Sequence, residues 1–209
     1  MIIAVDGPAA SGKGTLARRL AKHFGLNHLD TGALYRAVAF RALAAGADPA
    51  DPDAAVAAAR QIEPGDLADP QLREDKVAQA ASVVAAIPGV RAVLLAFQRD
   101  FARRSPGAVL DGRDIGTVVC PDADAKIFLT ASVEARALRR FKELQAAGGA
   151  AIYERVLQDM MLRDARDRER RTAPLQRATG AFELDTTALD ADAAFAAALR
   201  YIGELKPRR

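Results

Sequence analysis

Five short, mainly apolar runs are spaced along the chain, at residues 2–5, 28–29, 108–110, 126–129 and 182–184. Stretches with helical periodicity lie between most of them. This alternation is typical of a parallel sheet that helices cover on both faces. The pattern therefore predicts an α/β fold with a five-stranded parallel sheet flanked by helices.

Two helices can be placed from the residues at their ends. The first is predicted over residues 13–24, where Gly25 suits a helical C-terminus. The second is predicted to follow Thr31, which we expect to be its N-cap, and to fade near Gly46.

Two segments interrupt the alternation. Residues 47–107 contain no convincing strand, and prolines divide them into several helical pieces. About 60 residues is too long for a simple crossover connection, so we expect an inserted helical subdomain there. The second interruption, residues 148–174, begins at a Gly-Gly pair and carries an arginine-rich run from Arg163 to Arg171.

The composition is that of one compact domain. The chain has 209 residues, 50% of them apolar, which suffices for a single core over residues 1–209. Met1 leads straight into the first apolar run, and no run approaches the roughly 20 apolar residues that cross a bilayer. We therefore expect a cytoplasmic protein without a membrane partner. Cys120 is the only cysteine, so neither a disulfide nor a cysteine-based zinc site is expected.

The strongest functional signal follows the first predicted strand. Glycines there let the backbone curl so that successive N–H groups point inward at phosphate oxygens. The helix that follows adds its positive N-terminal end, and a lysine reaches the β- and γ-phosphates. The segment consists of Gly7, Pro8, Ala9, Ala10, Ser11, Gly12, Lys13, Gly14 and Thr15. It predicts a phosphate-binding loop, against the alternative of a glycine-rich turn without a ligand.

The end of this loop narrows the class of protein. The general motif has Ser or Thr directly after the lysine, whereas here Gly14 stands at that position and Thr15 follows. The ending Gly-Lys-Gly-Thr is similar to that of nucleoside monophosphate kinases. GTPases read guanine with an Asn-Lys-x-Asp segment, and the only asparagine is Asn27. Small-molecule kinases therefore remain.

Candidate acceptor-binding residues follow the second and third predicted strands. Tyr35 and Arg36 lie one turn into the second helix, where Arg36 is placed to bind an acceptor phosphate. Arg113 and Asp114 follow the third strand and offer both donors and an acceptor, as reading a base edge requires. A capped surface helix and a structural salt-bridge turn are the respective alternatives.

The arginine-rich run has a helical face that suits phosphoryl transfer. Arg163, Asp167 and Arg170 are spaced i, i+4 and i+7, which predicts that they share one face of a helix. Positive groups there would meet the charge of the transferred phosphoryl group. Arg166 is expected near the same face, whereas Asp164, Arg168 and Arg171 are expected on the solvated side. Three further arginines are candidates to add to the positive electrostatic field at this site, namely Arg136, Arg139 and Arg140.

The chain resembles the bacterial-type cytidylate kinases along nearly its whole length. The matching segments are residues 7–15, 30–36, 81–91, 111–119 and 163–170. The phosphate loop is shared by many families, whereas its combination with Asp-Gly-Arg-Asp-Ile-Gly-Thr-Val-Val and the long helical insert is much more specific. The resemblance implies that residues 47–107 bind the nucleoside monophosphate and that residues 148–174 form a lid.

The resemblance also implies roles for single residues. Ser82, Arg113 and Asp114 would contact the cytosine ring, while Thr31, Tyr35, Arg36 and Arg91 would line the acceptor pocket, with Arg36 and Arg91 near its phosphate. Asp167 would hold the ribose hydroxyls with the help of Arg163, and Arg170 would face the acceptor phosphate. The family usually has serine where this chain has Thr31, a departure that keeps the hydroxyl.

The implied reaction is direct in-line transfer of the γ-phosphoryl group of ATP to CMP or dCMP, with Mg²⁺ and without a covalent intermediate. Lys13, Arg163 and Arg170 are the predicted catalytic residues. No direct metal ligand is assigned, although Asp111 is a candidate through water. We expect a monomer.

Two other functions remain open from the residues alone. The first is a kinase of UMP, AMP or shikimate, of which the long insert disfavours the last. The second is a nucleic-acid-binding P-loop protein, which calls for stacking aromatic residues. Only 5% of the chain is aromatic and tryptophan is absent, so no nucleic-acid partner is expected.

Overall fold

The computed structural model describes residues 1–146 and 148–205. Its single sheet has the strand order β2-β3-β1-β4-β5, with every neighbouring pair parallel. The prediction of a five-stranded parallel sheet is confirmed, and each strand is somewhat longer than its apolar run. The strands are β1 (Ile2–Asp6), β2 (Asn27–Asp30), β3 (Ala108–Gly112), β4 (Ala125–Thr130) and β5 (Phe182–Asp185).

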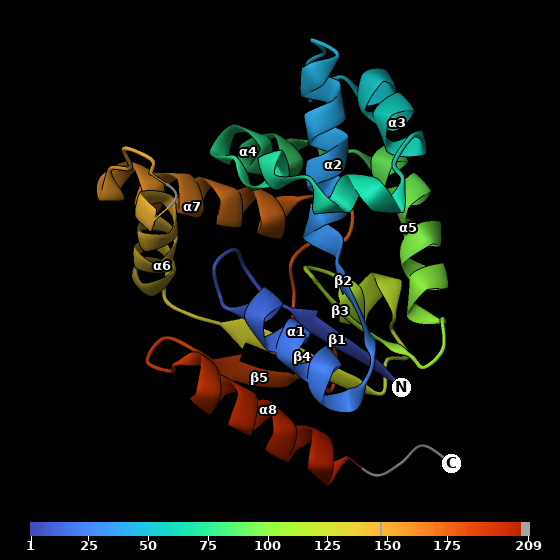
Figure 1. The fold of residues 1–209 in the computed structure, drawn as a ribbon, viewed down its shortest axis with the longest axis vertical. Helices are drawn as coiled ribbons and strands as arrows, with labels where there is room; N and C mark the ends of the chain where they lie inside the picture. The colour runs from blue at the N-terminus through green and yellow to red at the C-terminus, as the bar shows by residue number, and fades with distance from the viewer. Residues whose placement is uncertain (147, 206–209) are drawn as a thin grey trace.

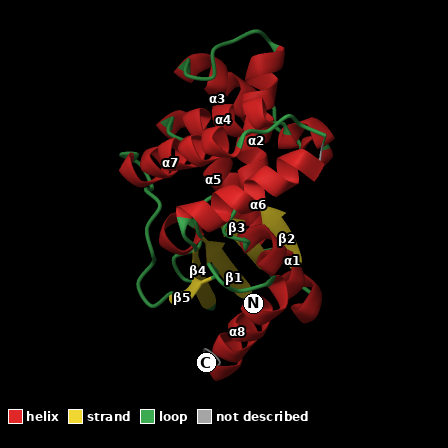
Figure 2. Ribbon diagram, turned by 90° about the vertical axis from the view of Figure 1, so that its left-hand side faces the viewer, coloured by secondary structure: helices red, strands yellow, loops and turns green. Residues whose placement is uncertain are grey.

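Helices cover both faces of the sheet, as continuous apolar strands require. On β1, Ile3 and Val5 pack into a cluster with α1 (Lys13–Phe24) and α8 (Ala191–Glu204), whereas Ala4 faces the opposite cluster. Figure 2 shows α8 below the strands and most of the other helices above them. Because successive side chains of a strand point to opposite faces of the sheet, the core is divided into two layers, one on each face.

The segment from residue 47 to 107 is entirely described and contains helices but no strand. With α2 (Thr31–Ala44) these helices gather at the upper end of the molecule in Figure 1. All but one begin with proline, which suits the first helical turn because its missing N–H has no partner there. The elements are α3 (Pro52–Arg60), η1 (Pro64–Ala68), η2 (Pro70–Arg73), α4 (Asp75–Val84) and α5 (Pro88–Ala102).

The second interruption contains one long helix, α7 (Tyr153–Glu169), which pairs with α6 (Val133–Ala146). The two helices share a small apolar cluster against which two residues of the predicted phosphate-binding loop also pack. In Figure 1, α7 runs from α6 toward the middle of the molecule and lies beside α4. The C-terminal part of α7 is therefore brought toward the loop between β1 and α1.

Asp6, at the end of β1, organises the carboxyl-terminal edge of the sheet. Its two carboxylate oxygens each accept a hydrogen bond of 2.8 Å, from the amides of Ile115 and Gly116 in η3 (Ile115–Val119), a turn of π-helix. Burial raises the pKa of Asp6 to about 7, although both amides lower it. These two hydrogen bonds hold the segment after β3 at the edge of the sheet where open α/β proteins bind their ligands.

No single helix among the described residues is both long enough and apolar enough to cross a membrane. The pair α4 and α5, bent by 99° between its halves, meets those criteria only when both helices are taken together.

We predict that Leu110→Ala lowers the free energy of unfolding by about 2–5 kcal/mol, because it leaves a cavity beneath the helices. Leu110 is 0% exposed at the centre of β3. The matched control is Leu162→Ala on α7, where the side chain is 57% exposed and the expected change is within about 0.5 kcal/mol. Denaturant titration of both variants measures the difference, and equal losses would contradict this assignment of the core.

Candidate functional site

The loop between β1 and α1 is curled, as predicted. A Cβ on Gly7 would lie 2.6 Å from the carbonyl oxygen of Leu129, so only glycine fits where the loop crosses β4. Gly12, the N-cap of α1, has φ +88°, a left-handed conformation that glycine adopts without strain. Lys13 Nζ reaches back to the carbonyl oxygen of Pro8 at 3.3 Å. The loop therefore folds back on the start of α1, a helix N-terminus of the kind that binds phosphate.

Lys13 is partly buried among other charged groups. Burial and the nearby Arg113 lower the pKa of Lys13 to about 7, while Asp111 and Asp30 raise it. Asp111 Oδ1 lies 3.7 Å from the point where a Cβ on Gly14 would be. A carboxylate thus stands close to the position at which the general motif places a hydroxyl. His28 Nε2 bonds the other oxygen of Asp111 at 2.9 Å.

The start of α2 differs from the prediction. Thr31 is the first helical residue and not the N-cap, a role that belongs to Asp30, whose carboxylate accepts from the amide of Ala33. The threonine hydroxyl instead donates to the carbonyl of Asp111 at 2.8 Å. Asp30 also pairs with Arg36 at 2.8 Å. Burial raises the pKa of Asp30, but the interaction with Arg36 outweighs burial, so the pKa lies below its usual value. Strand β2 ends at this carboxylate, so a single aspartate both starts the helix and orients Arg36.

A second arginine–carboxylate group joins the insert to the end of β3. Arg91, from α5, forms a buried ion pair with Asp114, and its guanidinium carbon lies 5.6 Å from the centre of the Tyr35 ring. Arg170 approaches the same carboxylate at 3.6 Å. Burial raises the pKa of Asp114, whereas both arginines lower it. This arrangement holds an acceptor oxygen between two cations.

A third group joins β3 to α7. Arg113 Nε donates to Asp167 Oδ2 at 2.7 Å. Burial raises the pKa of Asp167, but Arg113 and Arg163 lower it below the usual value. Burial and the neighbouring Arg113 also lower the pKa of Arg163 to about 10.

Two predictions for the arginine-rich run are wrong. Arg170 is not on the helical face, because α7 ends at Glu169 and Arg170 is its C-cap with an extended backbone. Asp164 is not solvated but buried, where it pairs with Arg136. For Arg170 the prediction failed because the helix ends before the periodic pattern does. For Asp164 it failed because α6 covers the face of α7 that was expected to be exposed.

The three arginines of α6 do not act together. Arg136 is buried against Asp164 and the loop residue Ala9. Arg139 donates to the carbonyl and the hydroxyl of Thr186. Arg140 pairs with Asp75 of α4 at 3.1 Å, which places one contact between the segment around α6 and α7 and the helical insert.

Several buried donors at the site have no hydrogen-bond partner. They are Nε of Arg36, Nε of Arg163 and Nη2 of Arg170, and the hydroxyl of Ser82 on α4 is also unpartnered. Buried polar groups are normally satisfied. Burial and neighbouring arginines lower the pKa of both Arg163 and Arg170. Unpaired donors in such surroundings indicate a site for anions.

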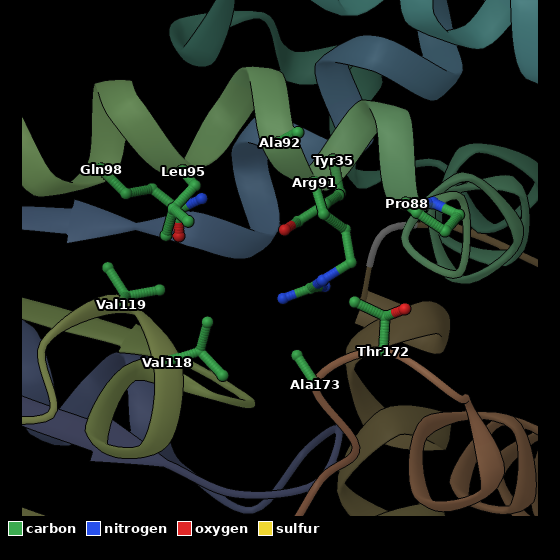
Figure 3. A pocket seen from close by; sticks show the side chains of 10 residues that line it. All are labelled: Tyr35, Pro88, Arg91, Ala92, Leu95, Gln98, Val118, Val119, Thr172 and Ala173. Atoms are coloured by element: carbon green, nitrogen blue, oxygen red, sulfur yellow. The ribbon is translucent and has the colours of Figure 1, made fainter.

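A cavity of about 190 Å³ lies between α5, η3 and the segment after α7, and Arg91 and Tyr35 are among the residues that line it. Figure 3 shows Arg91 extending into it from α5, with Tyr35 on one side and Thr172 and Ala173, from the segment after α7, facing it. Leu95 and Val118 add apolar walls. The cavity is thus mainly apolar with one guanidinium directed inward, which suits a flat, polar-edged ring.

The comparisons with known proteins agree with this geometry. The family model described as cytidylate kinase matches residues 3–204. A cytidylate kinase from Paramagnetospirillum magneticum is 63% identical over 205 residues, 97% of either chain. Another, from Methylocella silvestris, is 61% identical over 95% of this chain and 92% of its own. The chain belongs to the cytidylate kinase family. The resemblance inferred from the sequence is therefore confirmed.

A solved structure described as an uncharacterized protein from Eubacterium ventriosum has a TM-score of 0.57, covering 98% of this chain and 99% of its own. Its sequence identity is 15%, so the likeness concerns the fold alone. It agrees with the α/β architecture of a cytidylate kinase.

Sequence reasoning missed several residues of this cytidylate kinase site. Asp30 could have been found, because aspartate before a helix is a favoured N-cap. Asp6 and Thr186 gave no signal, since their partners lie far away in the chain. Thr186 Oγ1 donates to the carbonyl of Ser11 at 2.9 Å and so supports the phosphate loop from the segment after β5.

We predict that ATP binding takes up a proton. In the free protein the pKa of Lys13 is about 7, and contact with phosphate oxygens raises it. The bound state then holds the proton more tightly than the free state, so the affinity for ATP falls as the pH rises above about 7. Calorimetry at about pH 8 in buffers of different ionisation enthalpy should show uptake approaching about one proton per ATP.

The control for this measurement is Lys22→Met, on the exposed side of the same helix, which should leave the uptake unchanged. An uptake near zero in the wild-type protein would contradict the environment described for Lys13.

Proposed function

We propose that this chain transfers the γ-phosphoryl group of ATP to CMP or dCMP, giving ADP and CDP or dCDP. One observation carries the proposal: six cationic side chains from elements far apart in the sequence gather at the carboxyl-terminal edge of the sheet, and three of them have a buried donor without a hydrogen-bond partner. The unpaired donors belong to Arg36, Arg163 and Arg170. The other cations are Lys13, Arg91 and Arg113. Two phosphorylated substrates bound side by side would supply the anions that such a cluster lacks.

The donor would bind at residues 7–15. Its phosphates would accept hydrogen bonds from the loop amides and the N-terminus of α1, while Lys13 would bind the β- and γ-phosphates. Charge on Lys13 is unfavourable in the free protein because of burial and Arg113. Phosphate binding would restore the positive charge on Lys13. Lys13 would therefore be in its catalytically active, protonated form when the loop is occupied.

The acceptor base would be selected by Asp114. A carboxylate accepts a hydrogen bond from the exocyclic amine of cytosine, whereas uracil presents a carbonyl oxygen at that position and would repel it. Ser82, with its unpartnered hydroxyl, and Arg113 would complete the base contacts. Because Arg91 is already paired with Asp114, we propose that it acts mainly through that carboxylate, a narrower role than the phosphate contact that the resemblance implies.

The acceptor phosphate would lie between Arg36 and Arg170, each of which has a buried donor without a hydrogen-bond partner. Thr31 and Tyr35 would close the pocket on the side of α2. Asp167, with Arg163 beside it, would accept hydrogen bonds from the sugar hydroxyls. This placement puts the phosphate next to the donor loop and the base toward the insert, so that residues 47–107 act as the acceptor-binding segment and residues 148–174 as the lid.

Transfer would then proceed in line. An oxygen of the acceptor phosphate forms a bond to the γ-phosphorus, while the bond from that phosphorus to the β–γ bridging oxygen breaks and ADP leaves. The attacking oxygen is already anionic, so no general base is needed. Lys13, Arg163 and Arg170 would stabilise the negative charge on the transferred and bridging oxygens, and the lid would exclude water.

The residues present fit a magnesium ion bound mainly by phosphates. The described residues contain no cluster of three metal-ligating side chains, and Mg²⁺ in kinases is commonly held by one or two carboxylates, waters and substrate phosphates. Asp111, beside Gly14, is the carboxylate in position to hold it through water. Such an ion would neutralise charge on the β- and γ-phosphates.

A nucleic-acid-binding role fits the site less well. The converging arginines have little exposed area: 5% for the side chain of Arg170, 8% for Arg91 and 14% for Arg113. A polymer backbone is contacted by an accessible basic face, which these buried side chains do not provide. A small nucleotide enclosed by the insert and the lid meets them directly.

The reaction is tested by measuring ADP release with ATP, Mg²⁺ and each nucleoside monophosphate in turn. We expect CMP and dCMP to give the highest kcat/KM, with UMP and AMP lower by at least about 10-fold, since mispairing with the buried Asp114 costs a hydrogen bond to a charged group. Lys13→Met should remove turnover in a folded protein. Preference for AMP, or retained turnover in that variant, would contradict the proposal.

We predict that Asp114→Asn raises the KM for CMP by about 10- to 100-fold and narrows the preference for CMP over UMP, because a charged acceptor is lost. The KM for ATP should change by less than about threefold, since binding of the donor would not involve this carboxylate. Steady-state kinetics with each substrate varied separately measures both effects. Asp100→Asn, on the exposed side of α5, is the control, and equal shifts in both KM values would remove Asp114 from the base pocket.

A further inference from the structure

A buried ion pair between Arg136 and Asp164 joins the phosphate loop to the lid helix, and both residues line a cavity of about 480 Å³ between α6 and α7. Arg136 is 2% exposed and Asp164 is 5% exposed. Their contact is bidentate: Nη1 lies 3.1 Å from one carboxylate oxygen and Nη2 lies 2.6 Å from the other. Arg136 Nε donates to the carbonyl of Ala131 at 3.0 Å. The guanidinium is therefore engaged on all sides, and it cannot turn toward a nucleotide without leaving a carboxylate buried and unpaired.

On the loop side, Arg136 Nη1 also donates to the carbonyl of Ala9 at 3.3 Å. In a trans peptide unit the carbonyl and the next N–H point in opposite directions. Holding the carbonyl of Ala9 outside the loop therefore directs the amide of Ala10 the other way. Ala10 itself has φ +56°, a left-handed conformation that residues other than glycine seldom adopt. Such a conformation persists only where surrounding contacts enforce it, and Arg136 supplies one.

On the lid side, Asp164 follows Arg163 directly and precedes Asp167 by one turn of α7. The position of its carboxylate therefore sets the rotation of the helical turn that presents both side chains to the site. The apolar cluster around Ala137 and Met160, which includes Ala9 and Ala10, makes the same connection through packing. Loop and lid thus meet at one buried charge pair.

We propose that Arg136 and Asp164 are positioning residues for phosphoryl transfer. Their pairing fixes the lid helix and the phosphate loop relative to each other, so that Arg163 is aligned with the donor phosphate only when the loop amides are also in place. The inference rests on the proposed kinase function and assigns to neither residue a contact with substrate.

Stability alone is a weak reason for such a pair. A buried ion pair often contributes no more than well-packed apolar residues of similar volume, whereas removal of one partner is strongly destabilising. The double variant Arg136→Met/Asp164→Leu therefore separates the two explanations, because it removes the charges without leaving one unpaired. The control is Arg177→Met, which breaks the exposed pair between Arg177 and Glu183.

We expect the double variant to unfold at a temperature equal to or above that of the wild type, with kcat for CMP lowered by roughly 10- to 100-fold, the size of effect that misalignment produces. Both KM values should stay within about threefold. ATP hydrolysis without acceptor should rise relative to transfer, since a misplaced lid admits water. A folded double variant with kcat within about twofold of wild type, or with a change confined to KM, overturns the proposal. Should the double variant not fold, Asp164→Asn, which keeps the shape and one acceptor, is judged by the same criteria.

Amide hydrogen exchange tests the connection independently of the acceptor. In the double variant we expect faster exchange both in residues 7–15 and in residues 153–169, with no change in the Arg177→Met control. Faster exchange in residues 153–169 alone would show that the loop does not depend on the pair. Failure of the proposed kinase function would give a different result: the wild-type protein would transfer no phosphoryl group to CMP. The exchange experiment would still test whether the pair connects the phosphate loop to α7.

Discussion

A buried excess of positive charge governs the site. Arg36, Arg91 and Arg113 are each paired with one carboxylate, whereas Lys13 and Arg163 have their pKa values lowered by burial and by the neighbouring Arg113. The protein's own carboxylates do not complete this set. In the proposed function, bound phosphates would balance this charge, so the site would be electrostatically prepared for them before any nucleotide arrives.

The parallel sheet makes such a cluster possible. Strands β1, β2 and β3 all end at one edge, and the loop or helix that follows each strand contributes charged residues there. The insert and α7 add arginines from the other side. Groups that belong to distant parts of the sequence are thus enclosed together and shielded from water, where their interaction with a developing phosphoryl charge is strongest.

Aspartates set the direction of the arginines at this edge. Asp30 and Asp167 each hold one guanidinium, and Asp114 lies between those of Arg91 and Arg170. These contacts limit the number of conformations that binding must select. Asp164 holds Arg136 in a similar way but directs it at the backbone of the phosphate loop. In the function that we propose, the same chemical pairing would serve substrate binding in three places and internal alignment in the fourth.

The sequence by itself determined the parts whose cause is local. Buried parallel strands must be apolar, and the spacing of Gly7, Gly12 and Lys13 suffices for a phosphate loop, so both were predictable. The pairs Arg91–Asp114, Arg113–Asp167 and Arg136–Asp164 are 23, 54 and 28 residues apart, and only the tertiary structure decided them. Periodicity shows that a helix has two faces, but which face is covered depends on elements that pack against it from elsewhere. For that reason Asp164 was misplaced and Arg170 was assigned to a helix that had already ended.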